Sequence, residues 1–590
     1  MSDLTPPDGP EDTAILTTPE PLQPPAAPKS RRTAIIAAVS VGVAAVLGGG
    51  ALVAYKFIAS GPQPSEALPA SVLGVLSIDL DPGAKQKIEA IKTLHKFPGL
   101  KKSLNLGSTD DLRRYVFKEA TKDGTCKNLT YDADISPWIG NRAAVAAAEL
   151  GDHKVAPVFA LEVSDVGKAE TGVKKIIKCG GDGDIGYAFN DKYLIISDST
   201  AHAKEIVADA KKAPLSDDAK YQKWSDAAGD AGIVNFYVSS KAATYVANEV
   251  GDLAGSLSGL NDLSGLETGS SDSGGLPSGF PTDFPENNLP TPSDNAAAFH
   301  SGGGASAPRA ADPTDPSGAI KDALKNFQGL AGSIRFAGGG MELEIVSGGI
   351  QNVAGSGKVT DEVESLPADT ALALGVAYPG DVAKRIIDSV RSQFGAAADD
   401  QIAQAESMFG IKLPDDLQTL LGKAITLSLG GDAPASLDDV KGPADLPAGI
   451  KITGDADKIK AIITRLEDHS GLSLNDIGVV VESSGDKVAL VLQSAYAKRL
   501  LADGKLGDTA SFKKVVENAD KASAVLYLNF DSDWTRTIAQ AAGDAADTFG
   551  IDGPGSVDSV EANLKPLQAL GFTTWSEGSE SHVLLKVTTD

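Results

Sequence analysis

The order of predicted strands and helices is the same in two successive parts of the chain, and this repetition constrains the fold more than any other feature. The first part opens with LPASVLGVLSIDLDPG from Leu68 and the second with LPADTALALGVAYPG from Leu366, each an apolar strand followed by Pro-Gly. Later, APVFALEVSD from Ala156 parallels PAGIKITGD from Pro447, and both end in an aspartate before a helical pattern. We therefore predict two tandem copies of one domain.

Each copy contains strands in hairpins that alternate with helices. YAFNDKYLIIS and VVVESSGDKVALVLQ are paired apolar runs with turn residues between them, and each copy closes with a further hairpin. Asp165 and Asp455 stand where an N-cap side chain accepts a backbone N–H of the following helix. This pattern predicts an α+β fold: two copies of a mixed, largely antiparallel sheet domain with covering helices, placed after one transmembrane helix.

The longest uncharged segment predicts a membrane anchor. Thr33 to Tyr55 contains 23 residues without a charge, which as a helix spans about 34 Å and crosses a hydrocarbon core of about 30 Å. Lys29, Arg31 and Arg32 precede this segment, so the positive-inside rule leaves the N-terminus in the cytoplasm. A cleaved signal peptide is the alternative. We expect the bulk of the chain to lie outside the cytoplasm, held in the cell membrane.

These observations divide the chain into regions. The predicted regions are a disordered cytoplasmic tail (1–32), the transmembrane helix (33–55), a spacer (56–66), repeat A (67–350) with a disordered insert at about 255–317, a linker (351–365) and repeat B (366–590).

Charge and composition limit the partners. The formal net charge is −26, so the phosphates of nucleic acid would be repelled and we predict no nucleic-acid partner. The tail at residues 2–28 is rich in Pro and Thr and poor in large apolar side chains, so it cannot fold alone. Its threonines offer phosphorylation sites for a partner with an arginine cluster, although an inert tail is the alternative.

The two cysteines are predicted to form one disulfide. Cys126 and Cys179 are the only cysteines, and outside the cytoplasm thiols tend to be oxidised in pairs. Such a bond closes a loop worth roughly 4 kcal/mol in the chain-entropy model. Two unpaired buried thiols are the alternative.

No catalytic, cofactor or metal motif is found. Gly181, Gly183 and Gly186 fit G-x-G-x-x-G, but they follow a predicted helix and precede a strand, the reverse of the dinucleotide-binding order. The six histidines have no ligand spacing. We therefore expect no metal, no cofactor and no enzymatic activity, with a site built on carboxylates as the alternative.

A family resemblance agrees with this topology. The Pro- and Thr-rich tail, the single transmembrane helix, the opening LPASVLGVLSIDLDP, Phe97-Pro98 and the run DISPWIGNR from Asp134 resemble an uncharacterised actinobacterial membrane-anchored family, known only as domain of unknown function 3352. The second copy departs from it with Leu420-Leu421 in place of Trp-Ile. The resemblance implies the topology and no activity, ligand or catalytic residue.

Three functional hypotheses follow. The anchor and the repeat favour a non-catalytic binding or scaffold protein of the cell envelope with a protein partner. A carrier of an apolar or lipid ligand is the second hypothesis, because sheets covered by helices can enclose such ligands. A signalling protein regulated through its cytoplasmic Pro/Thr tail is the third.

Overall fold

The chain is described by a computed structural model, and all the residues that the structure describes belong to one compact unit, Ala51–Asp590. The described residues are 63–79, 90, 92–98, 111–121, 126, 128–151, 154–180, 185–245, 325–337, 339–349, 357–434, 439–531, 534, 540 and 557–590.

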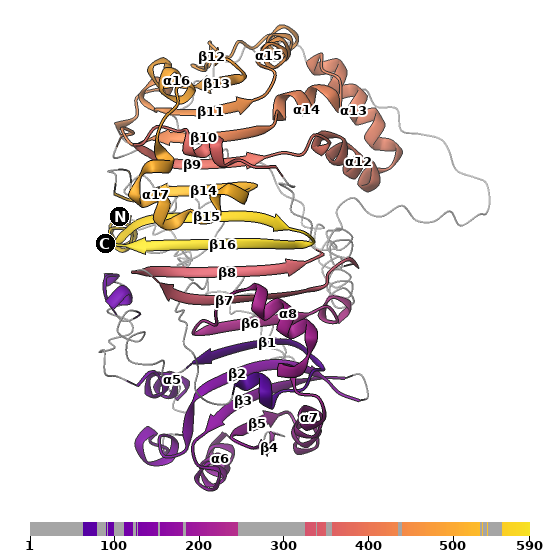
Figure 1. The fold of residues 1–590 in the computed structure, drawn as a ribbon, viewed down its shortest axis with the longest axis vertical. Helices are drawn as coiled ribbons and strands as arrows, with labels where there is room; N and C mark the ends of the chain where they lie inside the picture. Colours follow the sequence, from indigo (N-terminus) through magenta and orange to yellow (C-terminus); the bar gives the residue numbers. More distant parts are fainter. Residues whose placement is uncertain are drawn as a thin grey trace, which may run out of the picture. The chain divides into compact units, whose positions relative to one another are not determined.

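A single open sheet of sixteen strands is the centre of this unit (Figure 1). Its order is β12-β13-β11-β10-β9-β14-β15-β16-β8-β7-β6-β1-β2-β3-β5-β4, and all neighbouring strands pair antiparallel. The prediction of an α+β fold with a largely antiparallel sheet is confirmed. The strands are β1 (Val72–Asp79), β2 (Ile139–Glu149), β3 (Val155–Val163), β4 (Gly186–Asn190), β5 (Tyr193–Ser197), β6 (Val234–Ser239), β7 (Gly329–Ala337), β8 (Gly340–Gly348), β9 (Thr370–Ala377), β10 (Ala424–Gly430), β11 (Ala448–Thr453), β12 (Val480–Ser484), β13 (Lys487–Val491), β14 (Ala524–Asn529), β15 (Leu567–Glu577) and β16 (Glu580–Thr589).

The strand order reads the same from either edge of the sheet inwards. One half runs β4-β5-β3-β2-β1-β6-β7-β8 and the other runs β12-β13-β11-β10-β9-β14-β15-β16. The halves join where β8 pairs with β16, from Gly348↔Glu580 to Gly340↔Thr588. The sequence predicts a separate sheet domain in each of two copies. The structure instead has one continuous sheet, because β8 and β16, the closing strands of the two halves, pair with each other.

Helices cover both faces of this sheet, and two of them fall inside segments predicted as connections. α2 begins in the predicted spacer, and α11 lies in the predicted linker. The helices are α2 (Pro64–Ala67), α5 (Leu112–Ala120), α6 (Val166–Gly180), α7 (Thr200–Lys212), α8 (Ala219–Ala227), α11 (Thr360–Glu364), α12 (Val382–Phe394), α13 (Ala396–Phe409), α14 (Asp415–Leu421), α15 (Ala456–Ser470), α16 (Ser494–Leu501), α17 (Ala510–Val515) and α19 (Val557–Leu564), with short 3-10 or π turns at Tyr131–Ile135, Leu215–Asp217, Pro443–Asp445, Leu506–Asp508 and Ala519–Lys521.

We call one side of the sheet the helical face, because α2, α7, α8, α11, α16 and α17 pack on it. Ala160 of β3 is buried there in a core with Ile206 of α7. Successive strand residues point to opposite sides, and the next residue, Leu161, packs in a different core with Val173 of α6. α6 therefore lies on the opposite side, which we call the second face.

The second face is covered at both ends of the sheet by corresponding helices. α6 packs at the β4 end and α15 at the β12 end, where Ile459 and Ile463 are buried. The predicted N-caps are confirmed, since Asp165 accepts a hydrogen bond from the backbone N–H of Lys168 and Asp455 accepts one from Lys458. Each cap starts the helix that closes one end of this face.

The joint between the halves contains a network of buried charges on the helical face. Arg335 of β7 donates from Nε to Glu342 of β8 at 2.6 Å, and its Nη2 also pairs with Glu344. Lys586 of β16 lies 3.7 Å from the Glu342 carboxylate and pairs with Glu517. These ion pairs link β7, β8 and β16 across the joint.

Within the described ranges, every helix is too short or too polar to cross a membrane. The predicted anchor with its boundaries Thr33 and Tyr55, the tail at residues 2–28 and the insert at about 255–317 lie outside the described residues.

Candidate functional site

Five neighbouring strands bring apolar side chains into one row on the second face. Strand pairing places Ile450 opposite Leu427, and Leu427 opposite Leu374. Leu374 in turn faces Leu526, and Leu526 faces Phe572. Neighbouring strands are about 4.8 Å apart, so the row spans about 19 Å. We call these five residues the open apolar row.

Three members of the row are exposed to solvent. The exposed fractions are 37% for Ile450, 42% for Leu427 and 41% for Leu374. Single exposed leucines are ordinary, but adjacent ones form a patch of the kind that marks a binding surface. Covering each side chain fully is worth about 1.5–3 kcal/mol, so a ligand that shields the row gains substantial free energy.

The row lies between two covered parts of the second face. On one side α15 forms a core with Ile425, Ile452 and Leu490. On the other side, Ala90 and Leu94 pack in a separate core with residues of β1, β6, β7 and β8. The row belongs to neither core, which leaves it open in the described part of the chain.

The helices α12, α13 and α14 form an arm beside the same half of the sheet, and α12 and α13 carry exposed apolar side chains. They lie beyond the strand ends in Figure 1, and α13 and α14 contact α15. The exposed residues on this helical arm are Ile386 (42%), Phe394 (37%), Met408 (55%) and Phe409 (39%).

The row can bind by shielding hydrocarbon from water. Its five side chains carry no hydrogen-bond donor, acceptor or titratable group, so they can neither polarise a bond nor move a proton. Their favoured ligand is therefore apolar, and the driving force is the removal of apolar surface from water.

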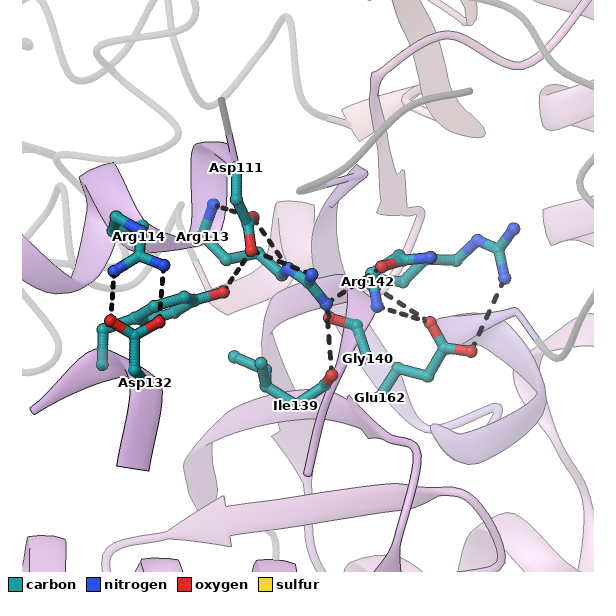
Figure 2. Close-up of polar contacts among 10 residues, drawn as sticks. Asp111, Arg113, Arg114, Asp132, Ile139, Gly140, Arg142 and Glu162 are labelled. Carbon is teal, nitrogen blue, oxygen red and sulfur yellow. Dashed lines mark hydrogen bonds and ion pairs between the residues drawn. The ribbon is translucent and has the colours of Figure 1, made fainter. Parts of the chain in front are cut away.

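Residues of the DISPWIGNR run form a polar corner that fastens α5 to β2 and β3 (Figure 2). Arg113 donates to Asp111 and, through Nη1, to the carbonyl oxygens of Ile139 and Gly140 at 3.2 Å each. Glu162 of β3 accepts the backbone N–H of Asn141 at 2.9 Å. The corner thus organises the start of β2.

A second set of pairs in this corner surrounds Tyr131. Arg114 lies over the Tyr131 ring at 4.6 Å and pairs with both oxygens of Asp132. Burial and the hydrogen bond that the hydroxyl donates to Asp111 raise the pKa of Tyr131 to about 12. Burial opposes the ionised form of Asp111, but its hydrogen bonds from Arg113 and Tyr131 outweigh this and lower the pKa of that carboxyl. The charged groups stabilise one another, so we interpret the polar corner as a structural contact and not as a binding site.

The predicted cysteine pair is brought together. A disulfide joins Cys126 to Cys179 at the end of α6, with the Cα atoms 5.2 Å apart, within the usual range for a disulfide. It ties the segment before the polar corner to the helix that covers the β4 end of the second face.

The glycine motif and the candidate metal ligands of the sequence do not form a binding site among the described residues. Gly186 begins β4, the next described element after α6, in the helix-then-strand order that argues against a dinucleotide site. Gly181 and Gly183 lie outside the described residues. Within the described ranges, no group of three or more His, Cys, Asp or Glu is placed to hold a metal ion.

One polar cluster in the structure was not predicted from the sequence. Lys451 of β11 has a fully buried side chain, and its Nζ donates to the carbonyl oxygen of Glu362 at 2.8 Å and to Oγ of Ser365 at 3.1 Å. The Glu362 carboxylate lies 3.4 Å away. The lysine inside the apolar run GIKIT is the one sign of this cluster in the sequence. Its partners could not be predicted, because they stand almost ninety residues earlier in the chain.

Comparison of the chain with protein-family models, with curated proteins and with solved structures finds no match. The family resemblance given above therefore stays an expectation.

Proposed function

We propose that this chain is a membrane-anchored binding protein of the cell envelope that holds the acyl chains of lipids on the open apolar row. The observation that carries the proposal is the adjacency of Ile450, Leu427 and Leu374, each more than a third exposed on one sheet face. Hydrocarbon chains satisfy such a surface because they need no hydrogen bonds. A scaffold for an envelope protein is the competing role.

The predicted anchor supports a lipid ligand. Residues 56–62 separate Tyr55 from the first described residue, Gln63, and seven extended residues reach about 25 Å. A helix over Thr33–Tyr55 would therefore keep the folded unit close to the bilayer outside the cytoplasm. The ligand would then be present at high local concentration.

We further propose that the two halves of the sheet are tandem copies of one ancestral domain. The matching strand order supports this, as do the corresponding helix pairs α2 and α11, α6 and α15, α7 and α16, and α8 and α17. Duplication frees one copy to change. The half with the open row is then the one adapted for binding.

Photocrosslinking tests the lipid proposal. The full-length chain, placed in phosphatidylglycerol and phosphatidylethanolamine vesicles with a phospholipid that carries a diazirine in its acyl chain, is expected to crosslink within residues 370–453 as well as within 33–55. Leu427→Asp should lower the first signal about tenfold, because it removes about 1.5–3 kcal/mol of apolar burial and introduces a charge. Crosslinks at 33–55 serve as an internal control.

Ile185→Asp is the matched control variant. Ile185 is 49% exposed but lies just before β4 in the other half, so its substitution should leave both crosslinks unchanged. Crosslinks confined to 33–55 would exclude the lipid role. Recovery of one envelope protein that Leu427→Asp releases would then favour the scaffold.

A further inference from the structure

The buried lysine of β11 is the charged group that the fold explains least. Its side chain is fully buried, and its Nζ lies within 3.4 Å of the Glu362 carbonyl oxygen, the Glu362 carboxylate and Ser365 Oγ. Lysine is almost never fully buried without a partner, and burial of an ion pair costs several kcal/mol per ion before the attraction is counted. A cluster of this kind needs a reason beyond packing.

The other half of the same sheet shows that the fold does not require these polar residues. Lys451 pairs with the third residue of β13, and Ala160 holds the same register against the third residue of β5. Ala160 is completely buried in an apolar core. Helices contact both strands, and the architecture holds with alanine at this position as well as with lysine.

Ser365 differs between the halves in the same way. It precedes Leu366, whose carbonyl oxygen accepts the N–H of Leu506, whereas Ala67 precedes Leu68, whose carbonyl oxygen accepts the N–H of Leu215. Ala67 is 3% exposed and packs in the apolar core. One half thus places Ala and Ala where the other places Ser and Lys within hydrogen-bond distance.

A cavity opens at this serine. Its volume is about 490 Å³, and Ser365 is part of its wall. Ser365 therefore belongs both to the hydrogen-bonded cluster of Lys451 and to a space large enough for a small organic molecule. The other lining residues are Asp361, Glu364, Asp503, Gly504, Lys505, Gly507, Asp508 and Lys513.

We propose that Ser365 is a nucleophile and Lys451 its general base, and that the cavity accepts carboxylic esters that carry a cationic group. Four carboxylates against two ammonium groups line the cavity, which favours a positively charged acyl compound. Ser-Lys pairs are an established variant of the Ser-His-Asp arrangement. This activity goes beyond the binding role, and it departs from the sequence-based expectation of no enzyme.

The covalent step uses only groups in the cluster and water. Ser365 transfers its hydroxyl proton to the neutral Lys451 amine while Oγ bonds to the carbonyl carbon of the ester. The carbon–oxygen bond to the alcohol breaks, and the departing alkoxide takes the proton from Nζ. Water then bonds to the acyl carbon while Nζ takes one of its protons. The bond from the acyl carbon to Oγ breaks, Oγ takes that proton from Nζ, and the carboxylic acid leaves.

The surroundings of Lys451 favour the neutral amine that a general base requires. Burial lowers the pKa of Lys451 and outweighs the opposing effect of Glu362. In the resting structure Nζ donates to Ser365 Oγ, and the Ser365 hydroxyl donates to the Glu362 carbonyl oxygen at 3.2 Å. A neutral amine has one lone pair, so it can accept the Ser365 proton once that hydroxyl turns from the carbonyl oxygen to Nζ. When the amine gains the proton, the nearby Glu362 carboxylate stabilises the ammonium, as the aspartate does in a Ser-His-Asp triad.

Acylation with 4-nitrophenyl 4-guanidinobenzoate tests the proposal on the full-length chain. One equivalent of 4-nitrophenolate should be released in a burst, and peptide mass spectrometry should place the guanidinobenzoyl group on Ser365. The neutral 4-nitrophenyl benzoate should react at least about tenfold more slowly at that residue, because it lacks the charge that the cavity carboxylates attract.

Two variants decide the roles. Ser365→Ala, which reproduces the residue of the other half, should fold and lose the burst. Lys451→Met should slow acylation of Ser365 about 100-fold or more. In the unsubstituted protein the acylation rate should rise with pH along a single ionisation, and the control variant Ser494→Ala should leave this pH profile unchanged. A burst equal in the original chain and Ser365→Ala, or adducts on surface lysines alone, would overturn the proposal.

Discussion

Replacing Arg335 by methionine is expected to lower the free energy of unfolding by about 3–5 kcal/mol at pH 7, the usual cost of removing one partner from a buried ion pair. Arg335 and Glu342 are 8% and 9% exposed, and the guanidinium also donates to the carbonyl oxygen of Asp230 at 2.7 Å. Without it, the carboxylates of Glu342 and Glu344 stay largely buried, and Lys586 remains 3.7 Å from the carboxylate of Glu342. Urea unfolding of the full-length chain, followed by tryptophan fluorescence, measures the loss.

The loss should depend on pH in a defined direction. Burial already raises the pKa of Glu344, and Arg335 opposes that rise. In Arg335→Met the pKa of the folded state goes further above its unfolded value, so the carboxyl binds a proton more readily when folded. The loss of stability relative to the unsubstituted chain should therefore be largest at neutral pH and should shrink as the pH falls through this raised pKa.

Two further variants separate charge from packing. Arg335→Met combined with Glu342→Leu should recover part of the stability, because fewer uncompensated charges remain buried. Lys384→Met removes an ion pair with Asp388 on the surface of α12 and should change stability by less than about 1 kcal/mol. Equal losses for Arg335→Met and Lys384→Met would show that the joint does not depend on this network.

Local patterns predicted the elements well, because each depends on neighbouring residues. The hairpin β4–β5 closes around Asp191, whose φ of 50° is the left-handed conformation that Asp tolerates in turns. The caps at Asp165 and Asp455 need only a carboxylate one residue before a helix. The pairing of β8 with β16 was not predictable in this way, because the sequence of each strand is also acceptable for the edge strand of a separate sheet.

The open apolar row could not be predicted from the sequence for a different reason. β9 reads TALALGVA, with Ala371 and Ala373 buried toward the helical face and Leu374 exposed on the second face. When both faces of a strand are apolar, alternation does not say which face a helix covers. The cluster at Lys451 could not be predicted, because β11 and α11 are far apart in the sequence and come into contact only in the folded chain.

Gly172→Ala is expected to destabilise the chain by about 3 kcal/mol, although alanine is the better helix former. A Cβ at this position of α6 would lie within 2.7 Å of Trp138 Cε2 and closer still to Nε1, and 3.0 Å from the carbonyl oxygen of Asp134. The indole cannot turn away freely, because its Nε1 donates to that same oxygen at 2.5 Å. Thermal and urea unfolding of the full-length chain measure the change.

Gly167→Ala, on the same helix, is the matched control and should have the opposite sign. Its Cβ would meet nothing closer than Asp165 Oδ1 at 3.6 Å, an ordinary contact, so the gain in helix propensity of up to about 1 kcal/mol is not offset by a clash. Trp138→Ala combined with Gly172→Ala should cost little more than Trp138→Ala alone, because the clashing ring is absent. Equal effects of the two glycine substitutions would show that close contact with Trp138 does not hold α6 against the polar corner.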